Sequence, residues 1–243
     1  MSLPAHLTRP AHATPQRSAH TTPPRPRTLD LSTYLVTDRR LSGRLGVLGV
    51  VSAAVAGGVS VVQLRDKTAD TRDFYDLVVA AARITAGRCL LLVDDRVDVF
   101  LAARHAGAEV DGVHVGQADL PAATVRALIG PDAVLGLTAN TPVHLRAAHA
   151  LPAGFVDYLG VGVIHPTATK PDHPEALGVA GFGKIARSTR LPCVAIGGIR
   201  LTDTAGLRAA GASGLAVVSA ICAADDPGEA TRAFADAWAG AAA

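Results

Sequence analysis

The chain has 243 residues, a length that suits one domain with a sizeable core and is short for two. Hydrophobic residues make up 49% and aromatic residues only 4%, so the core must be built from Ala, Val, Leu and Ile, which suits helices packed on parallel strands. The net charge is +2, but without the four arginines of residues 1–28 the rest is nearly balanced, which argues against a nucleic acid as the main partner.

The start of the chain differs in composition from everything that follows. Residues 1–28 are rich in Pro, Thr, His, Ala and Arg, contain no acid and show no apolar period. This composition predicts a disordered tail, set at residues 1–29, ahead of a catalytic domain at 30–243. The segment also resembles an organellar transit peptide, but it lacks an amphipathic pattern and prolines recur throughout, so a dispensable tail is favoured.

From Leu31 on, short β-branched or leucine-rich runs alternate with alanine-rich segments of helical spacing. The runs predict eight strands: Thr33–Thr37, Ser60–Leu64, Cys89–Val93, Gly112–Val115, Val134–Thr138, Tyr158–Val163, Cys193–Ile196 and Gly214–Ser219. Helices are predicted between them, for example at Thr71–Thr85, Val97–His105, Ala122–Ile129 and Thr202–Ala210. Eight such repeats predict a single (β/α)8 TIM barrel, since a doubly wound sheet would have fewer repeats and the first strand is followed by no GxGxxG.

Polar residues gather where the predicted strands end. They are Arg65, Asp66, Lys67, Asp94, Asp95, Arg96, Gln117, Asp119, Thr138, Thr167, Thr169, Lys170 and Ser219. In a (β/α)8 barrel the C-terminal ends of the strands form the face that carries the active site. The pattern therefore predicts a site at this rim.

Two glycines separate the seventh predicted strand from the next helix. Backbone amides at Gly197 and Gly198 are able to approach an anion closely, and a helix N-terminus beginning near Thr202 would add partial positive charge. Barrels of this kind often bind a phosphate between the loops after strands seven and eight, where Val218 and Ser219 also lie. A phosphate site is favoured here over a simple tight turn.

Acids and cations share the same rim. The segments QLRDK, DDRVD and GQADLP bring Arg65, Lys67, Asp95 and Asp119 to it, and acids gathered without compensation would repel one another and have raised pKa values. A Mg2+ ion, which prefers one or two carboxylates with phosphate oxygens and water, removes this difficulty. A diphosphate held through Mg2+ is therefore predicted, against the alternative that Asp95 and Asp119 only form surface ion pairs.

Cysteines and histidines point to no further chemistry. Cys89, Cys193 and Cys222 lie far apart with no CxxC pair, so reduced thiols and a cytoplasmic location are expected. No HExxH occurs, and His165 is expected to be an ordinary strand-end residue rather than a general base. No apolar run reaches the roughly 18 residues of a membrane span, so no membrane partner is expected.

Seven segments taken together resemble the thiamine phosphate synthase (thiamine-phosphate pyrophosphorylase) family. In chain order from Tyr34 to Ile221 they read YLVTDR, QLRDK, VDDRVD, DGVHVGQADLP, DYLGVGVIHPTATKPD, AIGGI and VVSAI. The resemblance implies a (β/α)8 barrel that joins 4-amino-2-methyl-5-(diphosphooxymethyl)pyrimidine to 4-methyl-5-(2-phosphooxyethyl)thiazole, releases pyrophosphate and uses one Mg2+ per subunit. These small molecules are the implied partners, and both a monomer and a homo-oligomer stay open.

The resemblance also implies a role for each matching position. The pyrimidine diphosphate would be bound by Gln63, Leu64, Arg65, Asp66, Lys67, Asp94, Thr138 and Lys170, of which Arg65, Lys67, Thr138 and Lys170 are catalytic. The thiazole phosphate would be bound by Thr167, Ala168, Thr169, Gly198, Val218 and Ser219, and the metal by Asp95 and Asp119. Asp94 departs from the family's usual asparagine, and His165 stands where an aromatic such as phenylalanine is common.

Three functions are weighed against one another. A transferase would ionise the pyrimidine diphosphate and let the thiazole nitrogen capture the carbocation, chemistry that needs electrostatics more than an acid–base pair. A tautomerase-like isomerase would use His165 or His144 as a proton shuttle, but it has no need of Arg65, Lys67 and Lys170. A ligand sensor that recruits a partner through its tail is the third. The transferase is favoured.

Overall fold

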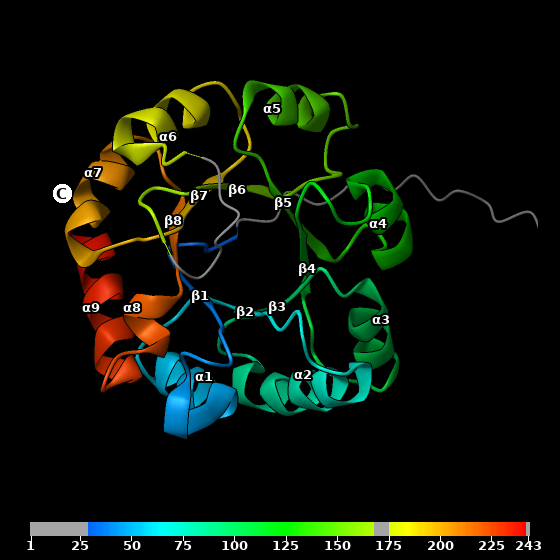
Figure 1. Cartoon of the computed structure of the whole chain (residues 1–243). Coiled ribbons are helices and arrows are strands. Elements are labelled where there is room, and N and C mark those ends of the chain that lie inside the picture. Colours follow the sequence, from blue (N-terminus) through cyan, green and yellow to red (C-terminus); the bar gives the residue numbers. More distant parts are fainter. Residues whose placement is uncertain (1–28, 168–174, 242–243) are drawn as a thin grey trace, which may run out of the picture.

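The computed structural model describes residues 29–167 and 175–241, and its centre is a closed barrel of parallel strands (Figure 1). The strands are β1 (Thr33–Val36), β2 (Val61–Leu64), β3 (Leu90–Asp94), β4 (Gly112–Val115), β5 (Val134–Thr138), β6 (Tyr158–Gly162), β7 (Cys193–Ile196) and β8 (Gly214–Val217). Each strand pairs with the next along the chain, and β1 closes the ring by pairing Tyr34 with Ala216 of β8. The predicted (β/α)8 barrel is confirmed.

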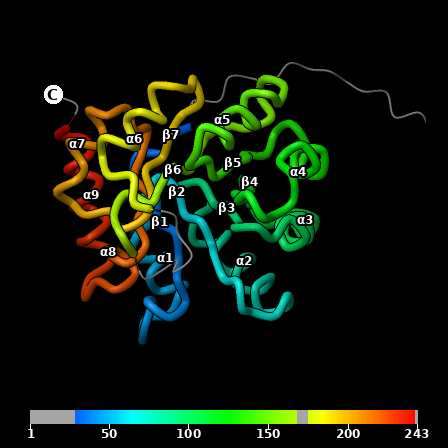
Figure 2. Tube along the Cα trace, turned by 45° about the horizontal axis from the view of Figure 1, so that its top comes forward, coloured from blue at the N-terminus to red at the C-terminus, as the bar shows by residue number. Residues whose placement is uncertain are grey.

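Helices form the outer ring of the barrel, as the tube view from a second direction also shows (Figure 2). They are α1 (Gly46–Ala56), α2 (Thr71–Thr85), α3 (Val97–His105), α4 (Ala122–Ile129), α5 (Pro142–His149), α6 (Gly178–Ala186), α7 (Thr204–Ala209), α8 (Ser219–Cys222) and α9 (Pro227–Gly240), with 3-10 turns η1 (Gly43–Leu45) and η2 (Leu201–Asp203). The bounds predicted for α2, α3 and α4 are confirmed.

Two predicted boundaries near the end of the barrel are wrong. The helix predicted at Thr202–Ala210 begins instead as the 3-10 turn η2 and becomes α-helical only at Thr204. The eighth strand was predicted to reach Ser219, but it ends at Val217 and Ser219 opens α8. Both errors have one cause: apolar patterning does not define the terminal residues of a strand or helix, and a helix often begins with a 3-10 turn.

Local chemistry explains where several helices begin. The Thr141 hydroxyl accepts a hydrogen bond from the His144 amide at 3.2 Å and caps α5, which has proline at its first position. The Asp226 carboxylate accepts from the Glu229 amide at 2.9 Å and caps α9 in the same way. Each cap satisfies an amide that the helix itself leaves without a partner, so these starts are encoded in the sequence.

Side chains alternate between two separate cores along each strand. Outward residues such as Val62 and Leu64 of β2 join the large core between the strands and the helices. Inward residues fill the barrel itself, namely Tyr34, Val36, Val61, Leu92, Val134, Tyr158, Val194 and Ala216. This alternation decides which residues near the strand ends reach the barrel mouth.

The N-terminal end of the barrel is closed by carboxylates with fixed partners. Asp111 precedes β4 and accepts from the Leu91 amide at 2.8 Å, and Asp157 precedes β6 and accepts from the Leu135 amide at 2.7 Å. The buried guanidinium of Arg126 pairs with Asp157 at 2.7 Å and also donates to three backbone carbonyls, of Phe155, Gly130 and Ala133. These groups stabilise the barrel at the face opposite the predicted site.

The cysteines and the helices bear on two further expectations, reduced thiols and the lack of a membrane span. All three cysteines are free; Cys193 and Cys222 are buried, and Cys89 is half-buried. Burial raises the pKa of each thiol to about 11, so none of them is a reactive thiolate at neutral pH. Within residues 29–167 and 175–241 no helix combines the length and the apolar character that crossing a bilayer requires.

Candidate active site

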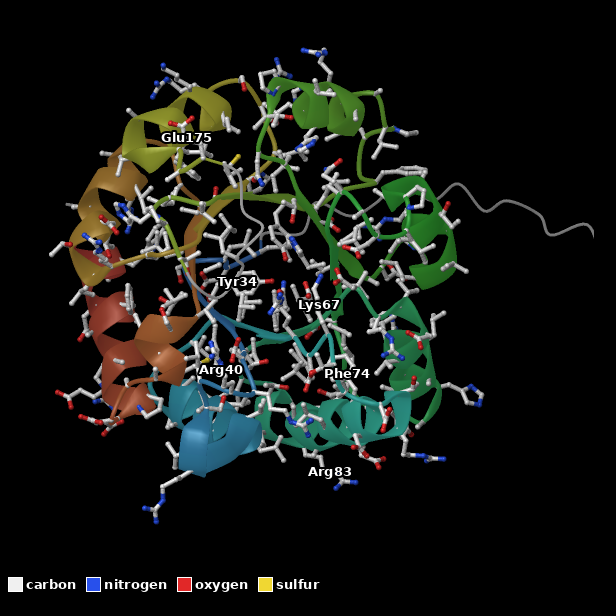
Figure 3. All side chains as sticks on the ribbon, in the orientation of Figure 1. Tyr34, Arg40, Lys67, Phe74, Arg83 and Glu175 are labelled. Atoms are coloured by element: carbon white, nitrogen blue, oxygen red, sulfur yellow. The ribbon has the colours of Figure 1, made fainter. Side chains whose placement is uncertain are left out.

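A cavity of about 140 Å³ lies at the C-terminal ends of the strands. Nine of the predicted site residues line it: Gln63, Arg65, Lys67, Asp94, Asp95, Asp119, Thr138, Thr167 and Val218. In Figure 3, Lys67 and Tyr34 lie inside the ring of helices, whereas Arg83 lies on its outer side. The structure thus brings into one cavity side chains from strand ends and loops that are far apart in the sequence.

Strand alternation explains the floor of this cavity. Gln63, Asp94 and Thr138 are the last inward-facing residues of β2, β3 and β5. Each lies two residues beyond another inward position, which is Val61, Leu92 and Gly136 respectively. The loops that follow then add the charged groups Arg65, Lys67 and Asp95. The cavity is therefore polar where the barrel core ends.

Asp94 is a buried acid whose ion pair with Arg65 is long. Its side chain is 10% exposed, and its Oδ2 lies 3.4 Å from Arg65 Nε. Burial, with the nearby charge of Asp95, raises the pKa of Asp94 to about 7, although Arg65 and Lys67 act in the opposite direction. Asp94 is therefore partly protonated at neutral pH, and a protonated carboxyl has a donor, as would the asparagine that the resemblance implies at this position.

Asp95 and Asp119 lie against each other at the edge of the same cavity. The ammonium of Lys67 is 2.7 Å from Asp95 Oδ2, and the Gly116 amide donates to Asp119 Oδ2 at 2.7 Å. Burial and then the hydrogen bond with Asp95 raise the pKa of Asp119. Burial opposes the charge on Lys67, but its hydrogen bond with Asp95 prevails and raises the pKa of this lysine.

The backbone at Asp95 is also unusual. Its φ of 59° lies in the left-handed region, and Asp95 is the one non-glycine residue with positive φ in the described part of the chain. Such a conformation costs free energy and tends to persist at functional sites, although aspartate tolerates it better than most residues. The carboxylate of this residue contacts both Lys67 and Asp119.

The donor set of this cavity fits Mg2+ when a substrate completes it. Mg2+ usually binds one or two protein carboxylates, with phosphate oxygens and water as its other ligands. Asp95 and Asp119 supply two adjacent carboxylates. Among residues 29–167 and 175–241 there is no cluster of three or more metal-ligating side chains, so these residues form no all-protein metal cage.

Several predicted residues do not line the cavity. Leu64 faces outward and is fully buried in the core under the helices. Asp66 accepts hydrogen bonds from Thr68 and the Ala69 amide at 3.0 Å, and these outweigh burial and lower its pKa, so it stabilises the loop after β2. Ser219 opens α8 beside the lining residue Val218. The predictions for Ala168, Thr169 and Lys170 fall outside the described residues.

The loops after β6 and β7 touch closely at the predicted phosphate site. Gly197 lines the cavity and Gly198 lies next to it, with φ values of 91° and 69°. A Cβ atom at Gly198 would lie 2.8 Å from the carbonyl oxygen of His165, so only glycine allows this approach. His165 itself does not line the cavity, and its Nε2 lies 3.0 Å from Asp203 Oδ2.

Sequence reasoning missed part of the lining. His114 and Asn140 both line the cavity; His114 Nε2 lies 3.0 Å from Thr138 Oγ1, and Asn140 Oδ1 accepts from the Gly162 amide at 3.1 Å. The alternation of β4 held the missing information, because Val113 and Val115 join the outer core and His114 between them must face inward. Asn140 follows β5 in a loop and had no such pattern.

A closed parallel barrel with acids, cations and amides gathered at the C-terminal ends of its strands has the architecture of a (β/α)8-barrel enzyme. Residues 33–221 match the family model described as thiamine monophosphate synthase, and the chain belongs to this family. The expectation drawn from the seven segments is confirmed.

Relatives and solved structures agree with the family. Thiamine-phosphate synthases of Azorhizobium caulinodans and Laribacter hongkongensis are each 46% identical to the chain, over 85% and 84% of it and over 94% and 93% of their own lengths. A solved thiamine phosphate pyrophosphorylase from Pyrococcus furiosus superposes with a TM-score of 0.76 at 32% identity, covering 88% of this chain and 98% of its own. The activity of the family is a transfer reaction, so the expectation of a transferase is confirmed at this level.

Proposed function

We propose that the chain joins the aminopyrimidine diphosphate to the thiazole phosphate and releases pyrophosphate, with Mg2+ bound at Asp95 and Asp119. The observation that carries the proposal is the meeting of Arg65, Lys67, Asp95 and Asp119 in one cavity. Two cations and two adjacent carboxylates suit a diphosphate held together with a divalent cation. Mg2+ supplies charge neutralisation for the diphosphate when it is bound.

The diphosphate half of the site would bind and activate the leaving group. Arg65 and Lys67 line the cavity, and each now pairs with a carboxylate, at 3.4 Å and 2.7 Å, that a bound diphosphate would compete with. Both charges already lie at the cavity before a substrate binds, and positive charge placed in this way stabilises developing anionic oxygens. Lys170, beyond the described residues, is proposed to act with them, and Gln63, Asp94 and Thr138 to orient the pyrimidine.

The other half of the site would hold the thiazole phosphate. The proposed contacts are Thr167, Ala168, Thr169, Gly198, Val218 and Ser219. The C–O bond between the pyrimidine methylene and the diphosphate breaks, the diphosphate leaves with the electron pair, and the thiazole nitrogen donates its lone pair to the methylene carbon. Positioning both substrates in one cavity supplies much of the rate enhancement that such a step needs.

The retained cations favour this reaction over the isomerase and the sensor. An isomerase that binds only a thiazole phosphate needs neither Arg65 nor Lys67, and within the described residues His165 pairs with Asp203 away from the cavity lining. A cytoplasmic location is proposed as well, because all three cysteines are free thiols.

A single assay distinguishes the three functions. The full chain is mixed with both substrates and Mg2+, and pyrophosphate and thiamine phosphate are measured together. The proposal expects equal amounts of the two products, and neither product when either substrate is left out. Binding of both substrates without pyrophosphate would favour the sensor, and conversion of the thiazole phosphate alone would favour the isomerase.

A further inference from the structure

A chain of hydrogen bonds crosses the barrel interior at the floor of the cavity. Gln63 Nε2 donates to Tyr34 Oη at 2.7 Å, and Tyr34 Oη lies 2.7 Å from Tyr158 Oη. Tyr158 Oη lies 2.9 Å from His114 Nδ1, and His114 Nε2 lies 3.0 Å from Thr138 Oγ1. Gln63 and Thr138 at the two ends line the cavity, whereas both tyrosines are 1% exposed.

The barrel interior provides space specifically for this row of hydrogen-bonded side chains. Two of the protein's three tyrosines take part, with ring centroids 6.1 Å apart, and the His114 ring lies 5.5 Å from that of Tyr158. On β5 a Cβ atom at Gly136 would lie 2.2 Å from Tyr158 Cζ and 2.4 Å from His114 Nδ1. Any other residue at Gly136 would therefore displace the middle of the chain.

The number of protons available determines which group donates in each of these hydrogen bonds. A tyrosine hydroxyl has one proton to donate, and Tyr34 Oη already accepts from Gln63. If Tyr158 donated to Tyr34 as well, the Tyr34 proton would have no acceptor among the described residues, and an unmade hydrogen bond in the core is costly. Tyr34 therefore donates to Tyr158, and Tyr158 donates to His114 Nδ1.

The direction determines the tautomer of His114 and the role of Thr138. An imidazole that accepts at Nδ1 carries its proton on Nε2 when neutral, so Nε2 donates to Thr138 Oγ1. The Thr138 hydroxyl then has its own proton left, and the structure records no acceptor for it within residues 29–167 and 175–241. Burial raises the pKa of both tyrosines, so neither loses its proton at neutral pH.

We propose that Tyr34, Tyr158 and His114 are positioning residues that make the Thr138 hydroxyl a hydrogen-bond donor to the oxygen of the departing diphosphate. This inference rests on the proposed function. No proton is transferred along the hydrogen bonds, because each hydroxyl and His114 Nε2 keeps its hydrogen. Thr138 donates a hydrogen bond to the oxygen that gains the electron pair of the breaking C–O bond. The hydrogen-bond network orients the Thr138 hydroxyl as a donor before the substrate binds, and such preorganisation favours a transition state.

The tautomer of His114 is tested first, without any substrate. Nitrogen NMR of the full chain with 15N-labelled histidine distinguishes the two neutral tautomers from the imidazolium, and a His114→Gln variant identifies the signals of this ring. The expected result at pH 7 is a neutral ring protonated at Nε2. A neutral ring protonated at Nδ1, or a charged ring, would overturn the proposal.

Kinetics then tests whether the tyrosine acts through Thr138. Tyr158→Phe should lower kcat/KM about ten-fold, mainly through kcat, which is the scale of one lost buried hydrogen bond. Thr138→Val should lower it at least as much, and the double variant should be no worse than Thr138→Val, because the two residues act in series. Tyr75→Phe on α2, which changes the remaining tyrosine in the same way, is the matched control and should keep wild-type activity.

Each outcome decides something. Independent, multiplying losses in the double variant, or wild-type activity in Tyr158→Phe, would overturn the proposal. If Tyr158→Phe does not fold, the NMR result on the wild-type chain decides alone. A wild-type chain that has His114 protonated at Nε2 but releases no pyrophosphate would refute the proposed function and support the network.

Discussion

The two ends of the barrel hold their carboxylates in opposite ways. At the N-terminal end, Asp157 pairs with Arg126 and accepts a hydrogen bond from the Leu135 amide. The hydrogen bonds that the Arg126 guanidinium donates are all 3.0 Å or shorter. At the C-terminal end, Asp94 is buried, its ion pair with Arg65 within the described residues is longer, at 3.4 Å, and burial raises its pKa to about 7. Within residues 29–167 and 175–241, similar chemical groups are thus closely paired at one end and more loosely paired at the other.

The difference separates stability from function within one fold. Removing one partner of a well-paired buried charge is strongly destabilising, whereas a buried acid with a raised pKa lowers stability while it is charged and is typical of functional sites. Asp95 adds backbone strain at the same end, with its φ of 59°. Substitutions at the C-terminal end should therefore change activity, and those at the N-terminal end should change stability.

The largest effect is expected at Arg65. Arg65→Ala should lower kcat by about 10²–10³-fold, because a fixed charge on the leaving diphosphate is lost. The melting temperature should change little, because Asp94 is able to take up a proton when its partner is removed. Steady-state pyrophosphate release and thermal unfolding measure the two quantities. Wild-type turnover would reject the role of Arg65.

The reverse pattern is expected at the other end. Arg126→Met should cost about 3 kcal/mol of unfolding free energy, because it leaves the Asp157 carboxylate and three carbonyls without their buried donor. The kcat of the folded enzyme should stay near that of the wild type. Urea denaturation followed by circular dichroism measures the loss. A large fall in kcat at unchanged stability would break the division between the two ends.

The pH dependence of stability gives a smaller effect with a definite sign. Asp94 titrates near 7 in the folded chain against an ordinary 3.8, so between these values the folded chain holds a proton that the unfolded chain has released. Its contribution to stability falls as pH rises through this window and is constant above it. Asp94→Asn should therefore raise the melting temperature of the substrate-free protein at pH 8 and change it little at pH 4.

The comparison of the two pH values is its own control. An equal change in melting temperature at pH 4 and pH 8 would mean that Asp94 has an ordinary pKa in the folded chain.

The smallest effect is expected at His165. Its pair with Asp203 is partly exposed, with side chains 27% and 13% accessible, so His165→Phe should cost less than about 1 kcal/mol. Activity should stay within about three-fold of the wild type, because His165 does not line the cavity. Unfolding and steady-state assays measure both. A loss of ten-fold or more in kcat would assign His165 a part in the reaction.

Much of the fold could be predicted because strand runs and helix periods are local properties. The bounds of α2, α3 and α4 follow from apolar spacing alone, and the eight strands follow from β-branched runs between glycines. The end of β8 and the start of α7 were predicted two residues away from their observed positions, because apolar patterning does not define the terminal residues of an element.

The candidate site shows the same division at the level of single residues. The motif QLRDK marked five neighbours, but strand alternation turns Leu64 outward, and turn chemistry assigns Asp66 to its own loop. His114 was overlooked because a histidine inside a valine-rich strand has no motif of its own. Its inward direction becomes meaningful only once the barrel brings Tyr158 and Thr138 beside it.

The most direct test of the account is the binding of inorganic pyrophosphate to the full chain, measured by titration calorimetry with and without Mg2+. We expect binding that needs Mg2+, that is lost in Asp95→Asn/Asp119→Asn, and that is kept in Arg126→Met at a temperature where this variant is folded. Binding of equal strength without Mg2+, or unchanged binding in the double aspartate variant, would contradict the claim that the acids of the C-terminal end serve a metal-bound diphosphate.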